Sequence, residues 1–315
     1  MYWLITLIRN FLFDYGILKS KAFEDVFVLC VGNIRVGGTG KTPMVEYLIN
    51  ALKDDFNIAV LSLGYKRKTK GIREISKQDD FQSVGDEPMQ MFERFPMIKF
   101  FVNKDRNKAI SFIKEKYPNT QVIILDDAYQ YRKTKPNRTI LLTEYYRPFY
   151  KDFLLPYGRL RERRKEKKRA DYIVVSKTPN NLTKEEKQQV VSKIKPNERQ
   201  QVFFASIGYN EDIKQVLEGK EVALLVGIDN PKPLQNYLQT FCKINKVLKF
   251  PDHHSFSQKE LEKISNITLP IVTTRKDFTR IKNTKAKIFI QDIQIVIDHT
   301  FIENIKKDIK QSGIQ

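Results

Sequence analysis

The sequence predicts an α/β protein with a mainly parallel sheet flanked by helices, and a second, smaller α/β domain. Apolar runs suited to buried strands alternate with helical patterns along most of the chain, as expected for strands joined by helical crossovers. The apolar run at residues 26–31 leads into a glycine cluster that ends in Gly-Lys-Thr at 40–42. A later apolar run ends in Asp126 and Asp127. These two strand ends predict a fold like that of the P-loop nucleoside triphosphatases.

Length and charge bound the organisation and the partners. A chain of 315 residues, 41% of them hydrophobic, is long enough for about two domains. We expect a membrane-interfacial amphipathic helix over residues 1–20, a P-loop kinase-like domain over 21–207 and a smaller C-terminal α/β domain over 208–315, which contributes the region around His253. The net charge of +19 indicates an anionic partner, such as nucleic acid, an acidic membrane surface or a phosphorylated ligand. The two cysteines, Cys30 and Cys242, show no metal-binding spacing and fit a reducing compartment.

The first eighteen residues have the pattern of an amphipathic helix. Large apolar residues recur along one stripe at helical spacing: Trp3, Leu4, Leu7, Ile8, Phe11, Leu12, Tyr15 and Leu18. The stripe is short for a membrane span, and no small-residue cleavage site follows it. We interpret it as a helix that lies in a membrane surface, with Trp3 and Tyr15 at the level of the headgroups. A helix packed on the protein's own core is the alternative.

The glycine cluster has the chemistry of a phosphate-binding loop. Gly37, Gly38 and Gly40 allow backbone N–H groups to close on an anion. Lys41 suits the β- and γ-phosphates of a nucleotide, and the hydroxyl of Thr42 suits Mg²⁺. The residues predicted to bind nucleotide are therefore Val36, Gly37, Gly38, Thr39, Gly40, Lys41 and Thr42.

The loop departs from the strict pattern at Arg35, which stands where the first glycine is expected. Gly-Gly-x-Gly-Lys-Thr also occurs in ATPases of the ParA/MinD type, which carry a lysine where this chain has Val36. A membrane-associated ATPase switch of that type is the main alternative. A GTPase is disfavoured because no Asn-Lys-x-Asp signature follows a strand, and a non-enzymatic scaffold would leave Lys41 and Asp126 without a role.

The other elements continue the alternation. In chain order they are a helix at 43–53, a strand at 57–63, a basic loop at 64–82, a helix at 89–94, a strand at 98–102, a helix at 105–117, strands at 121–127, 139–142 and 172–175, a helix up to 195 and a strand at 202–207. A second unit has strands at 222–228 and 270–274, a helix at 233–241, paired strands at 287–291 and 294–297, and a closing amphipathic helix. Thr42, with Asp126 or Asp127 at the end of its strand, is expected to bind Mg²⁺.

Six motifs in one order resemble those of the tetraacyldisaccharide 4′-kinases of lipid A biosynthesis. They are the glycine loop at 31–43, Val-Gly-Asp-Glu-Pro at 84–88, Asp-Asp-Ala-Tyr-Gln at 126–130, Leu-Pro-Tyr-Gly-Arg-Leu-Arg-Glu at 155–162, Phe-Pro-Asp-His-His at 250–254 and Thr-Arg-Lys-Asp at 274–277. The resemblance covers nearly the whole chain. It implies a transferase that uses ATP and Mg²⁺ to phosphorylate the 4′-hydroxyl of a tetraacyldisaccharide 1-phosphate, giving lipid IVA. It also implies that the partners are this glycolipid and the cytoplasmic face of the inner membrane, with no nucleic acid.

The resemblance also implies roles for individual residues. Asp86 and His253 are similar to the family's acid/base pair, and a carboxylate beside a neutral imidazole suits the removal of a hydroxyl proton. We prefer His253 to His254, because adjacent side chains of an extended segment point to opposite sides. Arg106 and Arg161 look like the family's phosphate-side arginines, whose planar fork can bind two phosphate oxygens. A capping or surface histidine, and surface ion pairs for the arginines, are the structural alternatives.

Overall fold

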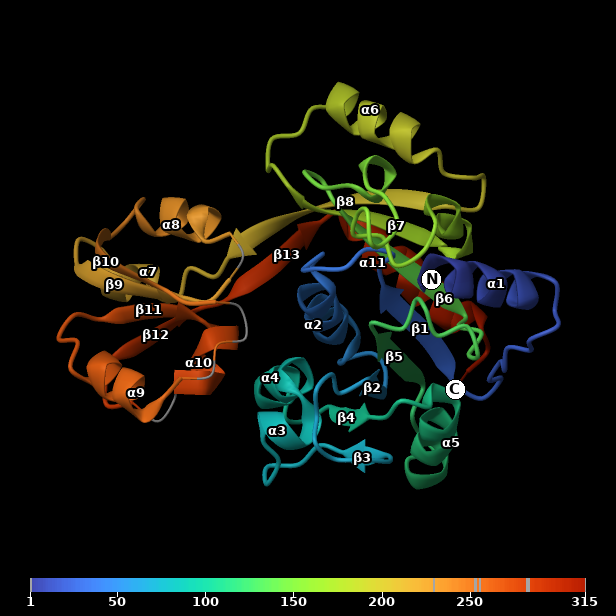
Figure 1. Cartoon of the computed structure of the whole chain (residues 1–315), viewed down its shortest axis with the longest axis horizontal. Helices are drawn as coiled ribbons and strands as arrows, with labels where there is room; N and C mark the ends of the chain where they lie inside the picture. The colour runs from blue at the N-terminus through green and yellow to red at the C-terminus, as the bar shows by residue number, and fades with distance from the viewer. Residues whose placement is uncertain (1, 229, 252–253, 255, 282–283, 315) are drawn as a thin grey trace. The chain divides into compact units, whose positions relative to one another are not determined.

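The computed structural model shows a mainly parallel sheet flanked by helices, and a second, smaller α/β unit, which confirms the predicted fold class (Figure 1). It describes the whole chain except residues 1, 229, 252, 253, 255, 282, 283 and 315. The chain divides into two compact units: Met1–Ile207 together with Ile295–Gln315, and Gly208–Gln294. Among the described residues, no helix is both long enough and apolar enough to cross a membrane.

The first unit is built on a nine-stranded sheet, counted over the described residues, in the order β13-β8-β7-β6-β1-β5-β2-β4-β3. The strands are β1 (Phe27–Gly32), β2 (Ile58–Ser62), β3 (Arg73–Glu74), β4 (Lys99–Val102), β5 (Val122–Asp126), β6 (Arg138–Glu144), β7 (Tyr172–Thr178), β8 (Gln201–Tyr209) and β13 (Ile293–Ile297). Neighbouring strands from β8 to β4 are parallel, and β3 is antiparallel to β4. The carboxyl ends of β1, β5 and β6 therefore meet at one edge.

Helices cover both faces of this sheet. They are α1 (Tyr2–Asp14), α2 (Lys41–Leu52), α3 (Phe81–Val84), α4 (Asp86–Arg94), α5 (Arg106–Lys116), α6 (Lys184–Ile194) and α11 (His299–Gln311), with 3-10 turns at Phe149–Lys151 and Arg164–Arg169. Along β1, Leu29 packs into the core formed with α2 and α11, whereas Cys30 packs into the core formed with α5. Because both faces are covered, β1 is an unbroken run of buried residues.

The C-terminal segment belongs to the first unit, which differs from the expectation that all of 208–315 forms the second domain. The α11 helix packs against α2, and β13 lies next to β8 at the edge of the sheet. Phe301 of α11 is fully buried, and its ring centroid lies 5.0 Å from that of Phe203 and 5.8 Å from that of Tyr172. The apolar face of the closing helix is therefore used in the core of the P-loop unit.

The second unit contains a parallel four-stranded sheet, again counted over the described residues, in the order β10-β9-β11-β12. Its elements are β9 (Glu221–Val226), β10 (Lys243–Lys249), β11 (Ile271–Thr274) and β12 (Ile288–Gln291), with helices α7 (Lys214–Leu217), α8 (Lys232–Leu238), α9 (Gln258–Ser265) and α10 (Arg275–Ile281). The predicted pairing of strands 287–291 and 294–297 is wrong, because β12 joins this sheet and β13 joins the first. Alternation predicts that a segment is a strand, but its partner depends on residues far away in sequence.

Candidate active site

The glycine loop lies at the carboxyl edge of the first sheet, between the end of β1 and the start of α2. Val31 of β1 is paired in parallel register with Asp126 of β5, so the loop and the two aspartates are neighbours. A Cβ on Gly32 would lie 2.7 Å from the Cβ of Tyr129, and only glycine permits this close approach of the segment after β5. Gly40 caps α2 in the left-handed conformation, with φ of 86°. The two predicted strand ends thus form one site.

Internal hydrogen bonds hold the loop in place. The Asn33 amide donates to the Thr39 hydroxyl (2.6 Å), and the Gln130 amide donates to the Asn33 carbonyl (2.7 Å). The Val36 N–H donates to the Arg159 carbonyl (2.7 Å), so in this conformation it does not point to a phosphate. A Cβ on Gly38 would meet no atom within 4 Å, which leaves open space beside the loop.

Two carboxylates outside the loop bind the Arg35 side chain. Its Nε donates to Asp152 (2.7 Å), and its Nη1 lies 3.4 Å from Glu144 at the end of β6. The residue is 7% exposed. Arg35 therefore anchors the loop to the neighbouring strand, which explains how a long side chain is accommodated where a glycine was expected.

Two of the predicted cations converge on one of the predicted aspartates. Lys41 Nζ lies 3.7 Å from Asp127 Oδ2, and Arg161 Nη1 lies 3.3 Å from the same oxygen. Arg161 Nη1 also donates to Gln130 Oε1 (3.2 Å), while the Arg161 backbone N–H donates to the Ile34 carbonyl (2.8 Å). Asp127 is thus the counter-charge of two cations at the mouth of the loop.

The second aspartate has a different environment. Asp126 is 4% exposed, its Oδ2 accepts a hydrogen bond from Ser62 (3.0 Å), and its Oδ1 is buried without a hydrogen-bond partner. Burial, followed by the negative charges of Glu87 and Asp127, raises the pKa of Asp126 to about 7. A buried carboxylate with an unused oxygen beside other carboxylates is a site where a cation would be stabilised.

Glu87 is the residue of this site that the sequence reasoning missed. The Thr42 hydroxyl donates to Glu87 Oε2 (3.2 Å), which brings the start of α4 to the start of α2. Glu87 lies in the motif at 84–88, in which the sequence predicts a role only for Asp86, the first residue of α4. Within the described part of the chain, no three or more His, Cys, Asp or Glu side chains form a metal-binding cluster. A P-loop magnesium site takes several of its ligands from phosphates and water instead.

The structure separates the two predicted arginines. Arg161 lies beside Lys41 as described above, whereas the Arg106 side chain is enclosed, and the residue is 3% exposed. Arg106 Nη1 donates to the carbonyls of Asn103 (2.8 Å) and Lys104 (3.2 Å), and the guanidinium lies over the Tyr131 ring. Burial lowers its pKa, although the charges of Asp126 and Asp127 act in the other direction. In this conformation Arg106 braces the turn before α5.

The predicted base is only partly described. Asp86 follows Gly85, whose φ of 97° turns the chain into α4, and His253 lies outside the described residues. His254 is described: its Nε2 lies 3.1 Å from Glu260, and its ring packs against Phe250 and Phe256. The roles of Asp86 and His253 stay predictions.

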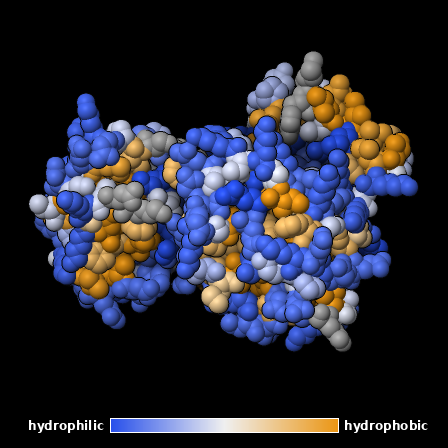
Figure 2. Space-filling view, turned by 90° about the horizontal axis from the view of Figure 1, so that it is seen from below, coloured by the Kyte–Doolittle hydropathy of each residue, from blue (hydrophilic) through white to orange (hydrophobic). Residues whose placement is uncertain are grey.

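The first helix presents its apolar side chains to solvent, which excludes the alternative that they pack on the protein's own core. Trp3, Leu4, Ile5, Ile8 and Phe11 are 41% to 59% exposed and form the orange patch at the upper right of Figure 2. The opposite face is polar and buried: Thr6 and Asn10 are less than 8% exposed. This arrangement inverts that of an ordinary surface helix, whose apolar face points to the core.

This chain is similar to known proteins over nearly its whole length. The family model described as LpxK, tetraacyldisaccharide-1-P 4′-kinase, matches residues 1–310. A tetraacyldisaccharide 4′-kinase of Flavobacterium johnsoniae is 42% identical, covering 96% of this chain and 91% of that protein. One from Bacteroides thetaiotaomicron is 36% identical, covering 95% and 86%. A crystal structure of LpxK from Aquifex aeolicus in complex with ATP superposes with a TM-score of 0.76 at 30% identity, covering 99% of this chain and 96% of that one.

Proposed function

The chain belongs to the LpxK family of tetraacyldisaccharide-1-P 4′-kinases, and from its P-loop site we propose how it acts. It transfers the γ-phosphoryl group of ATP to the 4′-hydroxyl of a tetraacyldisaccharide 1-phosphate, a lipid A precursor, and gives lipid IVA. The observation that carries this proposal is the convergence of Lys41, Arg161 and Asp127 at the loop, in a chain matched over nearly its full length by these kinases. The ParA/MinD-type switch is not favoured, since the relatives are lipid kinases and Val36 replaces the signature lysine.

Lys41 and Arg161 are proposed to bind the transferred phosphate. Both side chains already contact a negatively charged oxygen of Asp127. A phosphoryl oxygen can replace that oxygen as the partner of the two cations, so that no additional charge is buried. The loop residues 36–42 are proposed to surround the phosphates, and the open space beside Gly38 suits such a ligand. Phosphoryl transfer depends mainly on such positioning and charge stabilisation.

Mg²⁺ is proposed to bind at Thr42 and Asp126. Asp126 Oδ1 is buried and accepts no hydrogen bond, and burial beside other carboxylates raises the pKa of the residue, so a cation bound there would stabilise its charged form. Asp127 was the other candidate ligand, and its contacts with Lys41 and Arg161 favour a role beside the phosphates. Glu87 is proposed to hold the Thr42 hydroxyl in place. When bound, Mg²⁺ neutralises charge on the β- and γ-phosphates.

Asp86 and His253 are proposed to take the proton of the 4′-hydroxyl. In the transfer, the hydroxyl oxygen bonds to the γ-phosphorus, the bond to the β–γ bridging oxygen breaks, and ADP leaves. Asp86 is adjacent to Glu87, which supports a position near the reacting groups. The contacts of His254 with Glu260 and two phenylalanines support His253 as the histidine that acts. Arg106 is proposed to contribute through the electrostatic interaction of its positive charge with Asp126 and Asp127.

The α1 helix is proposed to lie in the cytoplasmic surface of the inner membrane. Its outward apolar face suits the acyl region, and the net charge of +19 suits an anionic lipid surface. An acyl-chain-bearing acceptor resides in that surface, so the helix brings the enzyme to its substrate. The association is proposed to be peripheral or monotopic, and nucleic acid has no part in it.

The purified chain in detergent, with ATP, Mg²⁺ and the tetraacyldisaccharide 1-phosphate, tests the proposal. We expect Mg²⁺-dependent phosphorylation of the lipid, and loss of transfer with retained ATP binding in Asp86→Ala and His253→Ala. The control is His299→Ala, since that histidine is exposed at the start of α11. ATP hydrolysis stimulated by DNA or a protein, without lipid phosphorylation, would instead support the ATPase switch. Transfer retained in both variants would refute the assigned base.

A further inference from the structure

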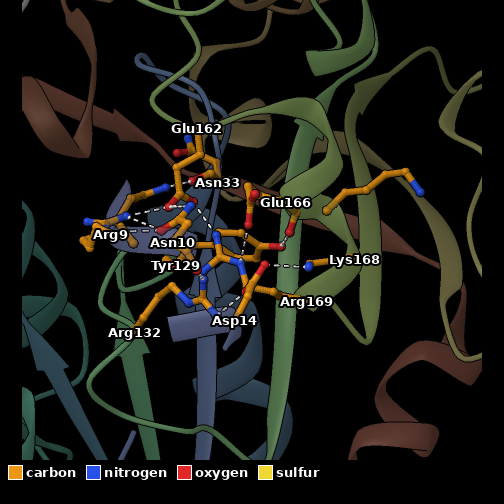
Figure 3. A network of polar contacts seen from close by, with 12 residues as sticks. Arg9, Asn10, Asp14, Asn33, Tyr129, Arg132, Glu162, Glu166, Lys168 and Arg169 are labelled. Carbon is orange, nitrogen blue, oxygen red and sulfur yellow. Dashed lines mark hydrogen bonds and ion pairs between the residues drawn. The ribbon is translucent and has the colours of Figure 1, made fainter. Parts of the chain in front are cut away.

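We propose that Glu162 is a positioning residue that links α1 to the phosphate-binding edge of the site, so that the docking of α1 sets the position of Arg161. The inference rests on the proposed function. Glu162 follows Arg161 directly in sequence, and its side chain points toward Arg9 and Asn10 of α1 (Figure 3). One short segment therefore has one residue in the site and the next residue in the contact with α1.

The contact with α1 is buried and charged. The Glu162 side chain is fully buried, and its Oε1 accepts hydrogen bonds from Arg9 (2.7 Å) and from the Asn10 amide (3.0 Å). Its Oε2 is bound by Arg169. A buried carboxylate needs all its partners, because removal of one leaves charge without compensation in a region of low dielectric. The position of Glu162 is therefore tied to the position of α1.

The same cluster continues to the segment after β5. The Arg169 guanidinium donates to the Tyr129 carbonyl (2.9 Å) and lies over the Tyr129 ring, with the carbon at 4.3 Å from the centroid. The Tyr129 hydroxyl in turn donates to the Glu166 carbonyl (2.6 Å). Tyr129 lies two residues after Asp127 and directly before Gln130, both of which contact Arg161. Glu162 is thus linked to the proposed phosphate-binding cation Arg161 in two ways. One link is the backbone, since the two residues are adjacent, and the other runs through Arg169 to the segment after β5.

A second anchor of α1 provides the matched control. Near the end of the helix, Asp14 is paired with Arg132 and with Lys168, both at 2.7 Å. The Lys168 side chain is half exposed, and in the network of Figure 3 it is joined to Asp14. A change at Lys168 loosens the same helix without touching the link to the site.

The test measures lipid phosphorylation, ATP affinity, melting temperature and binding to anionic phospholipid vesicles for Arg9→Gln and Lys168→Gln. Arg9→Gln should lower kcat by roughly 10- to 100-fold, the effect of a misplaced catalytic group. Its vesicle binding should be unchanged, because the apolar face of α1 is intact, and its ATP affinity should be unchanged, because Lys41 and the loop are intact. Lys168→Gln should resemble wild type. Arg9→Lys, which keeps the charge, should recover part of the loss even if Arg9→Gln melts at a lower temperature.

A double variant separates positioning from general loosening. If Arg9 acts through Arg161, adding Arg9→Gln to the Arg161→Lys variant should lower kcat by no more than about threefold. The effects of residues that act as a unit are not additive. Losses that multiply would overturn the inference, as would equal activity of Arg9→Gln and wild type. Absence of lipid phosphorylation by wild type would overturn the proposed function instead. The two failures are therefore distinguishable.

Discussion

Asp126→Asn should stabilise the metal-free protein while abolishing phosphoryl transfer. Burial and the neighbouring charges of Glu87 and Asp127 raise the pKa of Asp126 from 3.8 to about 7. At pH 8, ionisation of this carboxyl therefore destabilises the folded state relative to the unfolded state by about 4 kcal/mol, since each tenfold change in the ionisation constant corresponds to about 1.36 kcal/mol. An asparagine carries no charge, can still accept the hydrogen bond from Ser62, and can donate from its amide toward the acidic neighbours.

The raised pKa of Asp126 determines the sign of the stability change and the pH range over which it occurs. The stability that the protonated carboxyl contributes is fully present below about pH 4 and is lost as the pH rises through about 7. The gain from Asp126→Asn should therefore be about 1–2 kcal/mol at pH 5 and about 4 kcal/mol at pH 8. For a unit of this size, the gain at pH 8 corresponds to a rise in melting temperature of about 8 °C.

The assay is thermal unfolding in EDTA at pH 5 and pH 8, with lipid phosphorylation measured in parallel. Asp127→Asn is the control, because that side chain is 31% exposed and neutralises Lys41 and Arg161, so its loss should not stabilise the fold. A lower melting temperature for Asp126→Asn than for wild type at pH 8, or a gain that does not change with pH, would refute the reasoning. Full activity of Asp126→Asn would refute its role with Mg²⁺.

Three further predictions test other parts of the structure. Glu87→Gln should raise the Mg²⁺ concentration needed for half-maximal lipid phosphorylation by about tenfold, because the Thr42 hydroxyl loses its carboxylate partner; an unchanged requirement would contradict the role given to Glu87. Phe301→Ala should destabilise the P-loop unit by about 3–5 kcal/mol in denaturant unfolding, since the ring is fully buried; a loss below about 1 kcal/mol would mean that α11 does not belong to that core. Replacing both Ile5 and Ile8 with serine should reduce sedimentation with phospholipid vesicles while leaving ATP affinity unchanged, because both side chains are exposed; undiminished sedimentation would exclude α1 as the membrane contact.

Local sequence determined the elements that carry the phosphate chemistry. The apolar run of β1, the glycines that follow it and the two aspartates at the end of β5 each depend on residues within a few positions, so pattern and conformational preference are sufficient to recognise them. Parallel pairing of Val31 with Asp126 then brings the loop and the aspartates together, as the fold class requires. The family resemblance supplied the acceptor, which the loop alone does not specify.

Tertiary structure decided what depends on residues far apart in the chain. The sequence does not show that Glu87 reaches Thr42, that Arg106 is enclosed while Arg161 is not, or that residues 295–315 return to the first unit. It shows that α1 is amphipathic, but only the fold shows that its polar face is buried, where Glu162 accepts from Arg9 and Asn10. The physical reason is that periodicity defines a face of an element, whereas the partner of that face depends on the charges and volumes that the rest of the chain places against it.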